Sequence, residues 1–332
     1  MTCGAAIREL WDGNRLLVAL PYRGSVTYEN PLLSRPGAVA ADPPDAGVAA
    51  HYGDPYAEQR RLEDGSGWVD LSHHDVVRIA GADRLDYLHA MASQVFEGLE
   101  SGRHVDTLIL SPQGHIEHAF GGWDDGEAFV AHTEPGRGEA LVELIDSTRF
   151  MMRVEAEIVT EALALVYDGA PLLVERATLA DRPGELSGVW AYEALRIAAG
   201  RPRFGVDTDH RTIPNELGLI GSVAHVDKGC YRGQETVARV HNLGRPPRRL
   251  TRLHLDGSVD RLPAPGAEVS VDGAAVGVVG SSARHYELGP IGLALLKRAT
   301  PVDAALLADG IAASQEALVD PDVGLHVRAA LR

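Results

Sequence analysis

The sequence predicts an α+β protein of two or three domains that ends in a small β-barrel or sandwich. The chain has 332 residues, which is long for one domain, and 45% of them are apolar, which is enough for sizeable cores. Strand-like and helix-like segments are mixed up to about residue 246. After Pro246 and Pro247 only short strands separated by turns follow, a pattern typical of small barrels.

Residues 1–50 are expected to form an N-terminal extension that is partly irregular. Pro31, Pro36, Pro43 and Pro44 interrupt it among Ala and Gly residues. The first residues lack the basic and apolar segments of a secretory signal, and no run of about 18 apolar residues is present to span a membrane. We therefore expect a cytoplasmic protein with no membrane partner.

The segment 51–150 alternates strand and helix patterns. Asp83 occupies an N-cap position before Leu85, Leu88 and Met91, which share one helical face. A further helix is expected over 138–147, and strands are expected over 68–71, 76–79, 107–110, 115–120 and 128–132. A tight turn at 111–114 joins two of these strands as a hairpin.

The segment 151–246 begins with strands and ends in loops. Strands are expected over 154–159, 163–167 and 172–175, and a helix over 185–199, which Gly200 terminates. The Gly-, Pro- and Asp-rich stretch 202–224 is expected to be a loop. In the last segment, 247–332, the barrel strands are expected over 249–255, 268–271, 275–281 and 291–297.

Charge and cysteine content exclude several classes of protein. The formal net charge of −16 argues against broad, direct binding of nucleic acid, because attraction to phosphates needs positive charge. The two cysteines, Cys3 and Cys230, are too few for a disulfide framework or a zinc-type cysteine cluster. No glycine-rich nucleotide loop is present.

The segment from Lys228 to Glu235 combines several residues suited to chemistry. Lys228 and Arg232 flank Cys230, and neighbouring cations favour the thiolate form of a cysteine. Lys228 is one of only two lysines among 31 basic residues, which suggests a position that needs a compact ammonium. Between residues 228 and 252 seven basic residues oppose one acidic residue, so the segment suits an anionic small molecule. The alternative is a solvated, arginine-rich linker.

The octapeptide Lys-Gly-Cys-Tyr-Arg-Gly-Gln-Glu at 228–235 resembles the K-G-C-[FY]-x-G-Q-E signature of YgfZ-type folate-binding proteins. These proteins are related to the tetrahydrofolate-dependent aminomethyltransferase, or T-protein, of the glycine cleavage system. Further similar segments are found at 76–88, 110–114, 195–202, 213–216 and 265–292, so the resemblance covers roughly residues 54–332. It implies a three-domain cloverleaf around a folate-sized opening, with folate-binding domains at 51–150 and 151–246 and a barrel at 247–332.

Two departures from the transferase pattern bear on activity. Glu117 and His118 follow the hairpin where the transferase carries a carboxylate pair, and Ala198 stands where it carries a Glu suited to the pterin edge. A carboxylate that accepts two N–H bonds contributes about 1.5–3 kcal/mol per bond, and Ala198 makes no such contact. Methylene transfer is therefore not expected, although Asn215, Glu216 or Glu235 could compensate for the missing anchor.

The resemblance implies an accessory protein that binds tetrahydrofolate or a related reduced folate and supports assembly or repair of iron–sulfur enzymes. Its partners would be those enzymes or cluster carriers, and Cys230 would act as a redox or cluster-facing thiolate that Lys228 keeps ionised. The predicted folate contacts are Gly229, Tyr231, Gly233, Gln234, Glu235, Arg239, Trp190, Asn215 and Glu216. Arg239 would hold the glutamate tail, and Trp190 would stack on the pterin unless it is a packing residue.

Other readings remain. The chain could be a folate-dependent one-carbon transferase, or a binding module that has lost folate. No metal site is expected, because His73 and His74, and likewise His115 and His118, point to opposite faces of a strand. A stable resident cluster is also not expected, because such clusters need about four ligands.

Overall fold

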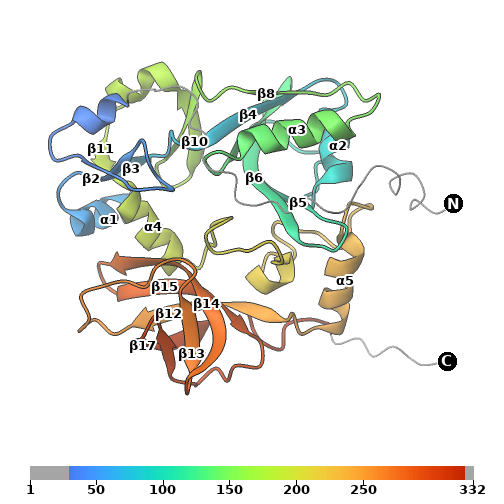
Figure 1. Ribbon diagram of the computed structural model, residues 1–332. Coiled ribbons are helices and arrows are strands. Elements are labelled where there is room, and N and C mark those ends of the chain that lie inside the picture. Colours follow the sequence, from blue (N-terminus) through green and yellow to red (C-terminus); the bar gives the residue numbers. More distant parts are fainter. Residues whose placement is uncertain (1–29, 326–332) are drawn as a thin grey trace, which may run out of the picture.

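The structure is a computed structural model that describes residues 30–325. Three lobes are visible in Figure 1: two mixed lobes side by side at the top and a barrel beneath them. The arrangement confirms the predicted α+β class, the cloverleaf and the C-terminal barrel. Residues 1–29, with Cys3, and residues 326–332 lie outside the described part.

The first lobe contains a four-stranded sheet in the order β10-β9-β3-β11. Its strands are β3 (Gly67–Asp70), β9 (Leu163–Tyr167), β10 (Pro171–Glu175) and β11 (Glu185–Ser187). Around it lie η1 (Pro31–Ser34), β1 (Val39–Ala40), β2 (Ala49–His51), α1 (Pro55–Glu63) and η2 (Arg176–Asp181). Asp54 caps α1 by accepting the N–H groups of Tyr56 and Ala57 at 3.0 Å.

One predicted helix begins later than its periodicity indicates. The prediction of helix from 185 is wrong, because Glu185–Ser187 pairs in parallel with Gly67–Val69 as β11. Gly188 then separates the strand from α4 (Val189–Ala198). The first sheet therefore combines residues from 51–150 and 151–246; the proposed division at 50, 150 and 246 stays a prediction.

The second lobe contains a five-stranded antiparallel sheet in the order β5-β6-β7-β4-β8. The strands are β4 (Asp75–Ala80), β5 (His104–Leu110), β6 (Ile116–Asp124), β7 (Ala128–Thr133) and β8 (Glu155–Ile158). Helices α2 (Arg84–Met91) and α3 (Gly138–Thr148) pack on one face around Phe96 and Phe129. Asp83 precedes α2 as expected but does not cap it, because its carboxylate binds Arg153 at 2.6 Å.

The third lobe is a closed barrel in the order β12-β15-β14-β13-β16-β17. Its strands are β12 (Arg248–Leu255), β13 (Glu268–Val271), β14 (Ala274–His285), β15 (Gly289–Lys297), β16 (Leu306–Ala308) and β17 (Ile311–Ala317). Four of them coincide with predicted strands. The pair β16 and β17, which closes the barrel, was not anticipated, since β16 has only three residues and β17 is Ala-rich.

Residues 200–225 cross the middle of the molecule, between α4 and α5 (Gln234–Leu243) (Figure 1). This stretch is loop as predicted, apart from the short η3 (Pro214–Leu217). An apolar cluster there joins the lobes, and it includes Leu110 of β5, Ile197 of α4, Val237 of α5 and Leu250 of β12. The signature segment leads from this centre into α5.

Candidate functional site

The loop before α5 is fastened to α2 by the ammonium group of Lys228. Its Nζ donates to the backbone carbonyls of His89 and Ala92 at 2.6 Å and of Gln94 at 2.7 Å. These carbonyls lie at the C-terminal end of α2 and just beyond it, where a cation is favoured by the helix dipole. An ammonium has three N–H donors, so each is used by a carbonyl. Lys228 thus holds the loop in place.

Gly233 allows the loop to approach the hairpin between β5 and β6. Its φ of +81° lies in the left-handed region, and a Cβ there would lie 2.4 Å from the carbonyl oxygen of Ser111. Across the contact, Gly114 has a φ of +83°, and its Cβ would lie 3.0 Å from the Cβ of Thr236. A side chain at Gly233 would therefore force the two segments apart.

Polar side chains fix the same loop from both ends. Gln234 donates to the carbonyls of Val226 and Lys228 at 3.0 Å. Arg232 pairs with Glu117 of β6 at 2.8 Å. Burial raises the pKa of Glu117, and the neighbouring Arg232 opposes that rise. The carboxylate expected to stand in for a catalytic group is thus engaged with the signature loop.

Cys230 lies exposed on this immobilised loop. It precedes the N-terminus of α5, an environment in which the helix dipole favours a negative sulfur. The thiol is therefore presented to solvent by a loop that Lys228 binds to the end of α2 through three hydrogen bonds and that Gln234 braces internally through two.

His89 is a neighbour of the loop that the sequence did not single out. Its Nδ1 accepts the N–H groups of Phe96 and Glu97 at 3.3 and 3.2 Å, which leaves the ring proton on Nε2. A Cβ at Gly229 would lie 3.8 Å from this Nε2. Burial and the nearby Lys228 lower the pKa of His89, so the neutral ring offers one N–H donor beside the loop. His89 and the loop are far apart in sequence, so their proximity is seen only in the folded structure.

Tyr231 points inward, in contrast to Cys230. It belongs to the central apolar cluster, and its ring centroid lies 5.0 Å from Lys228 Nζ. Burial raises its pKa to about 12. Its hydroxyl has no hydrogen-bond partner among residues 30–325. Tyr231 anchors the loop in the core.

The remaining predicted ligand contacts are spread over separate places. Asn215 lies near the loop, since its Nδ2 donates to the Val237 carbonyl at 3.3 Å. Glu235 and Arg239 lie exposed on α5. Trp190 is 53% exposed at the start of α4, with its ring 5.2 Å from that of His51. Figure 1 shows α4 and α5 on opposite sides of the central stretch, so the structure does not bring Trp190 to the signature.

The residues do not fit the pterin of a folate in the expected way. Glu216 is buried and pairs with Arg248 at 2.8 Å. Glu117 is engaged by Arg232, and Ala198 offers only its carbonyl, which accepts from Arg252. Glu117 and Glu216 are therefore engaged, and of the carboxylates that the resemblance offers only Glu235, exposed on α5, is not paired among residues 30–325. The folate contacts remain a prediction.

A group of potential metal ligands escaped the sequence analysis. His104 and Asp106 of β5 and His132 of β7 place ligand atoms within 4.8 Å of one another, with the two histidine Nε2 atoms 3.1 Å apart. Gly121 lies between them on β6, opposite Asp106 and His132, and leaves the space in which they converge. Two imidazoles and a carboxylate suit zinc or iron. The three residues meet because of the register in which β5, β6 and β7 pair, and this register could not be predicted from the sequence.

No helix in residues 30–325 is long and apolar enough to cross a membrane.

Comparison with known proteins shows which proteins this chain is similar to. The model of the CAF17 C-terminal beta-barrel domain matches residues 248–317. A putative chloroplastic transferase, At1g60990 of Arabidopsis thaliana, is 26% identical over 67% of this chain and 64% of its own length. The mitochondrial iron-sulfur cluster assembly factor IBA57 of Mus musculus is 31% identical over 48% of this chain and 43% of its own. The tRNA-modifying protein YgfZ of Yersinia enterocolitica is 33% identical over 41% and 39%.

Each of these alignments spans less than two thirds of the relative's length. Among solved structures, the glycine cleavage system aminomethyltransferase T from Bartonella henselae superposes with a TM-score of 0.72. The superposition covers 88% of this chain and 97% of that one at 15% identity, so it shows a shared fold.

Proposed function

We propose that this chain, which is similar to proteins of the YgfZ and IBA57 type and shares the aminomethyltransferase fold, serves iron–sulfur enzymes as an accessory factor through the thiol of Cys230. The supporting observation is the contrast between an exposed thiol and the fully engaged residues around it. A rigid loop presents a ligand without the entropic cost of ordering it at the moment of contact.

The proposed step is a ligand exchange in which the cluster is cargo. The sulfur of Cys230 binds one iron of a cluster held by a carrier or enzyme, and the thiolate that it displaces leaves with the proton of Cys230. No electron is transferred, and one Fe–S bond replaces another. The described residues contain one cysteine, so the other ligands come from the partner. His89 Nε2–H could donate to the bound sulfur.

Tetrahydrofolate or a related reduced folate is the ligand that the family resemblance implies. Because the expected carboxylates are engaged or missing, no part of the proposed step depends on it. Calorimetric titration with tetrahydrofolate tests this separately. Heat of binding with a measurable Kd would support retained folate binding, and no heat at millimolar ligand would favour a module that has lost folate.

Complementation of cells that lack the protein tests the proposal. We expect Cys230→Ser to leave the activity of cluster-dependent enzymes unrestored, while Glu117→Gln restores it. Both variants should first be shown to unfold at nearly the wild-type temperature. Full restoration by Cys230→Ser would reject the proposal.

A one-carbon transferase is the second candidate, supported by the shared fold. It requires turnover with tetrahydrofolate and an aminomethyl donor, and that turnover should be lost in Glu117→Gln and retained in Cys230→Ser. The two candidates thus predict opposite sensitivities at the same two residues. The cytoplasmic location expected from the sequence also stays a prediction.

A further inference from the structure

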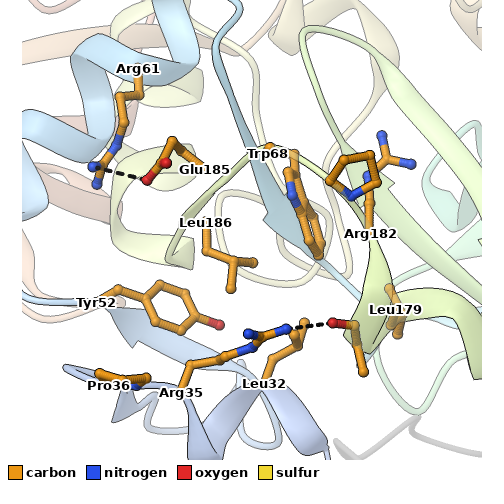
Figure 2. Close-up of a pocket in the computed structure, with 13 residues that line it drawn as sticks. Leu32, Arg35, Pro36, Tyr52, Arg61, Trp68, Leu179, Arg182, Glu185 and Leu186 are labelled. Carbon is orange, nitrogen blue, oxygen red and sulfur yellow. Dashed lines mark hydrogen bonds and ion pairs between the residues drawn. The ribbon is translucent and has the colours of Figure 1, made fainter.

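The first lobe contains a cavity of about 370 Å³ that is remote from the Cys230 loop. It lies between η1, β2, β3, η2 and β11 and is lined by residues that include Arg35, Tyr52, Arg61, Trp68, Arg182 and Leu186. In Figure 2, Tyr52 and Trp68 flank Leu186 from opposite sides, and the guanidinium of Arg35 lies near the Tyr52 hydroxyl. A cavity of this size accommodates a small metabolite.

Four buried donors of this cavity lack partners. They are the Tyr52 hydroxyl, Trp68 Nε1 and the Nε atoms of Arg61 and Arg182, which make no hydrogen bond to any residue in 30–325. Trp68 is only 3% exposed. A buried donor without an acceptor costs about 1–3 kcal/mol, so such groups rarely gather by chance. All four can donate, and they therefore call for a ligand rich in acceptors.

Charge in the lining points the same way. Three arginines, Arg35, Arg61 and Arg182, line the cavity with one carboxylate, Glu185, which is 72% exposed and 3.9 Å from Arg61. Arg182 is already paired with Asp168, which lies outside the lining, at 2.5 Å. Two carboxylates near Tyr52 are already engaged. Glu58 accepts the N–H groups of Tyr52 and Gly188 at 2.8 Å, and Asp70 accepts from Asn30 at 2.6 Å and from Ser72 at 2.9 Å. Their partners are neutral, so both keep their charge, and the positive charge of the lining is concentrated at Arg35, which donates to the Ala180 carbonyl and has no carboxylate partner in residues 30–325.

The walls between these donors are apolar. Leu32, Leu179 and Leu186 line the cavity beside the Trp68 indole. Gly184, at a φ of +102°, leaves the indole edge uncovered, since a Cβ there would lie 3.1 Å from Trp68 Cδ1. We propose that this cavity binds a small organic carboxylate with a flat apolar body, its acceptors meeting Tyr52, Trp68 and the arginines. This site is independent of the Cys230 proposal.

Calorimetry on the full chain with sodium benzoate tests the site. Benzyl alcohol and inorganic phosphate serve as the neutral and the purely ionic comparison. We expect benzoate to bind most tightly. Tyr52→Phe keeps the ring and removes one donor, and Trp68→Phe removes one donor and part of the aromatic surface. Each should weaken binding at least about tenfold, the equivalent of one hydrogen bond to a charged group. Arg35→Gln should weaken it at least as much, and Arg153→Gln, an exposed charge in another lobe, should not.

Thermal unfolding without ligand separates this role from a structural one. If the Tyr52 hydroxyl awaits a ligand, Tyr52→Phe leaves the unfolding temperature unchanged or raises it, because an unpaired buried donor is removed. Trp68→Phe also removes packing volume from a buried cluster, so its effect is judged from binding alone. The proposal is overturned if benzoate gives no heat, if the variants bind it as wild type does, or if benzyl alcohol or phosphate equals it. Cys230→Ser should bind benzoate as wild type does, so failure of the cavity proposal can be distinguished from failure of the Cys230 proposal.

Discussion

Arg203 and Lys228 are both cations placed away from water, but their surroundings differ. Arg203 is buried among three carboxylates, with Asp45 and Glu134 at 2.7 Å and Glu193 at 3.7 Å. Burial opposes the charge of Arg203, and the three carboxylates outweigh it and raise its pKa. Lys228 has only neutral carbonyls as hydrogen-bond partners, and burial lowers its pKa to about 8.

The difference separates a structural site from a functional one. Asp45 belongs to the first lobe, Glu134 follows β7 of the second, and Glu193 lies on α4, so Arg203 neutralises charge where elements meet. Lys228 leaves its charge uncompensated by any hydrogen-bonded carboxylate, beside an exposed thiol. Lys228 thus contributes to the functional site by positioning the loop that presents Cys230.

The largest effect is expected at Arg203. Arg203→Met leaves Glu134 without a cation and leaves Asp45 and Glu193 only their second partners, His73 and Arg196. We expect the free energy of unfolding to fall by about 3–5 kcal/mol. Chemical denaturation measures it. Arg153→Gln is the control, because Arg153 is 74% exposed in its pair with Asp83, and exposed pairs contribute about 0–1 kcal/mol. Equal effects of the two variants would remove the structural role given to Arg203.

A smaller effect is expected at Gly233. Gly233→Ala adds a Cβ at 2.4 Å from the Ser111 carbonyl oxygen on top of an unfavourable φ, and should cost about 3 kcal/mol. Gly221→Ala is matched in conformation, with a φ of +87° and nothing within 4 Å, and should cost only about 1 kcal/mol. If both cost the same, the loop does not depend on the close approach to the hairpin.

The smallest loss is expected at Lys228. Lys228→Met leaves three carbonyls without a donor but also removes the desolvation of a charge, so a net loss of about 2 kcal/mol is expected. Lys297→Met is the matched control, because its Nζ binds one exposed carbonyl, that of Ala275. We call the three hydrogen bonds of Lys228 the clamp of the loop. A loss of unfolding free energy in Lys228→Met no larger than in Lys297→Met would contradict this clamp.

The effect of Lys228→Met on the free energy of unfolding should also depend on pH. The folded pKa of Lys228, about 8, lies below its ordinary 10.5, so between these values the unfolded chain binds more protons at this residue. Its contribution to the free energy of unfolding therefore rises with pH across this window and is constant below it. Wild type should gain stability relative to Lys228→Met between pH 8 and 10.5. A difference that does not change with pH would contradict the lowered pKa.

The sequence predicted local features better than contacts. The octapeptide located the loop, because its signature is a pattern of neighbouring residues. The carbonyl partners of Lys228 lie 134–139 residues away, so the sequence suggested thiol activation where the structure shows a clamp. The His104–Asp106–His132 group and the donors around Trp68 likewise depend on register and packing between distant segments.

Cluster reconstitution on the purified chain tests the central claim most directly. Ferric iron and sulfide are added anaerobically with glutathione as the external thiol and reductant, and the visible absorption of a bound cluster is recorded for wild type, Cys230→Ser and Cys3→Ser. If Cys230 is the presented ligand, wild type and Cys3→Ser acquire a glutathione-dependent cluster and Cys230→Ser does not. A cluster of equal intensity on Cys230→Ser would contradict the account.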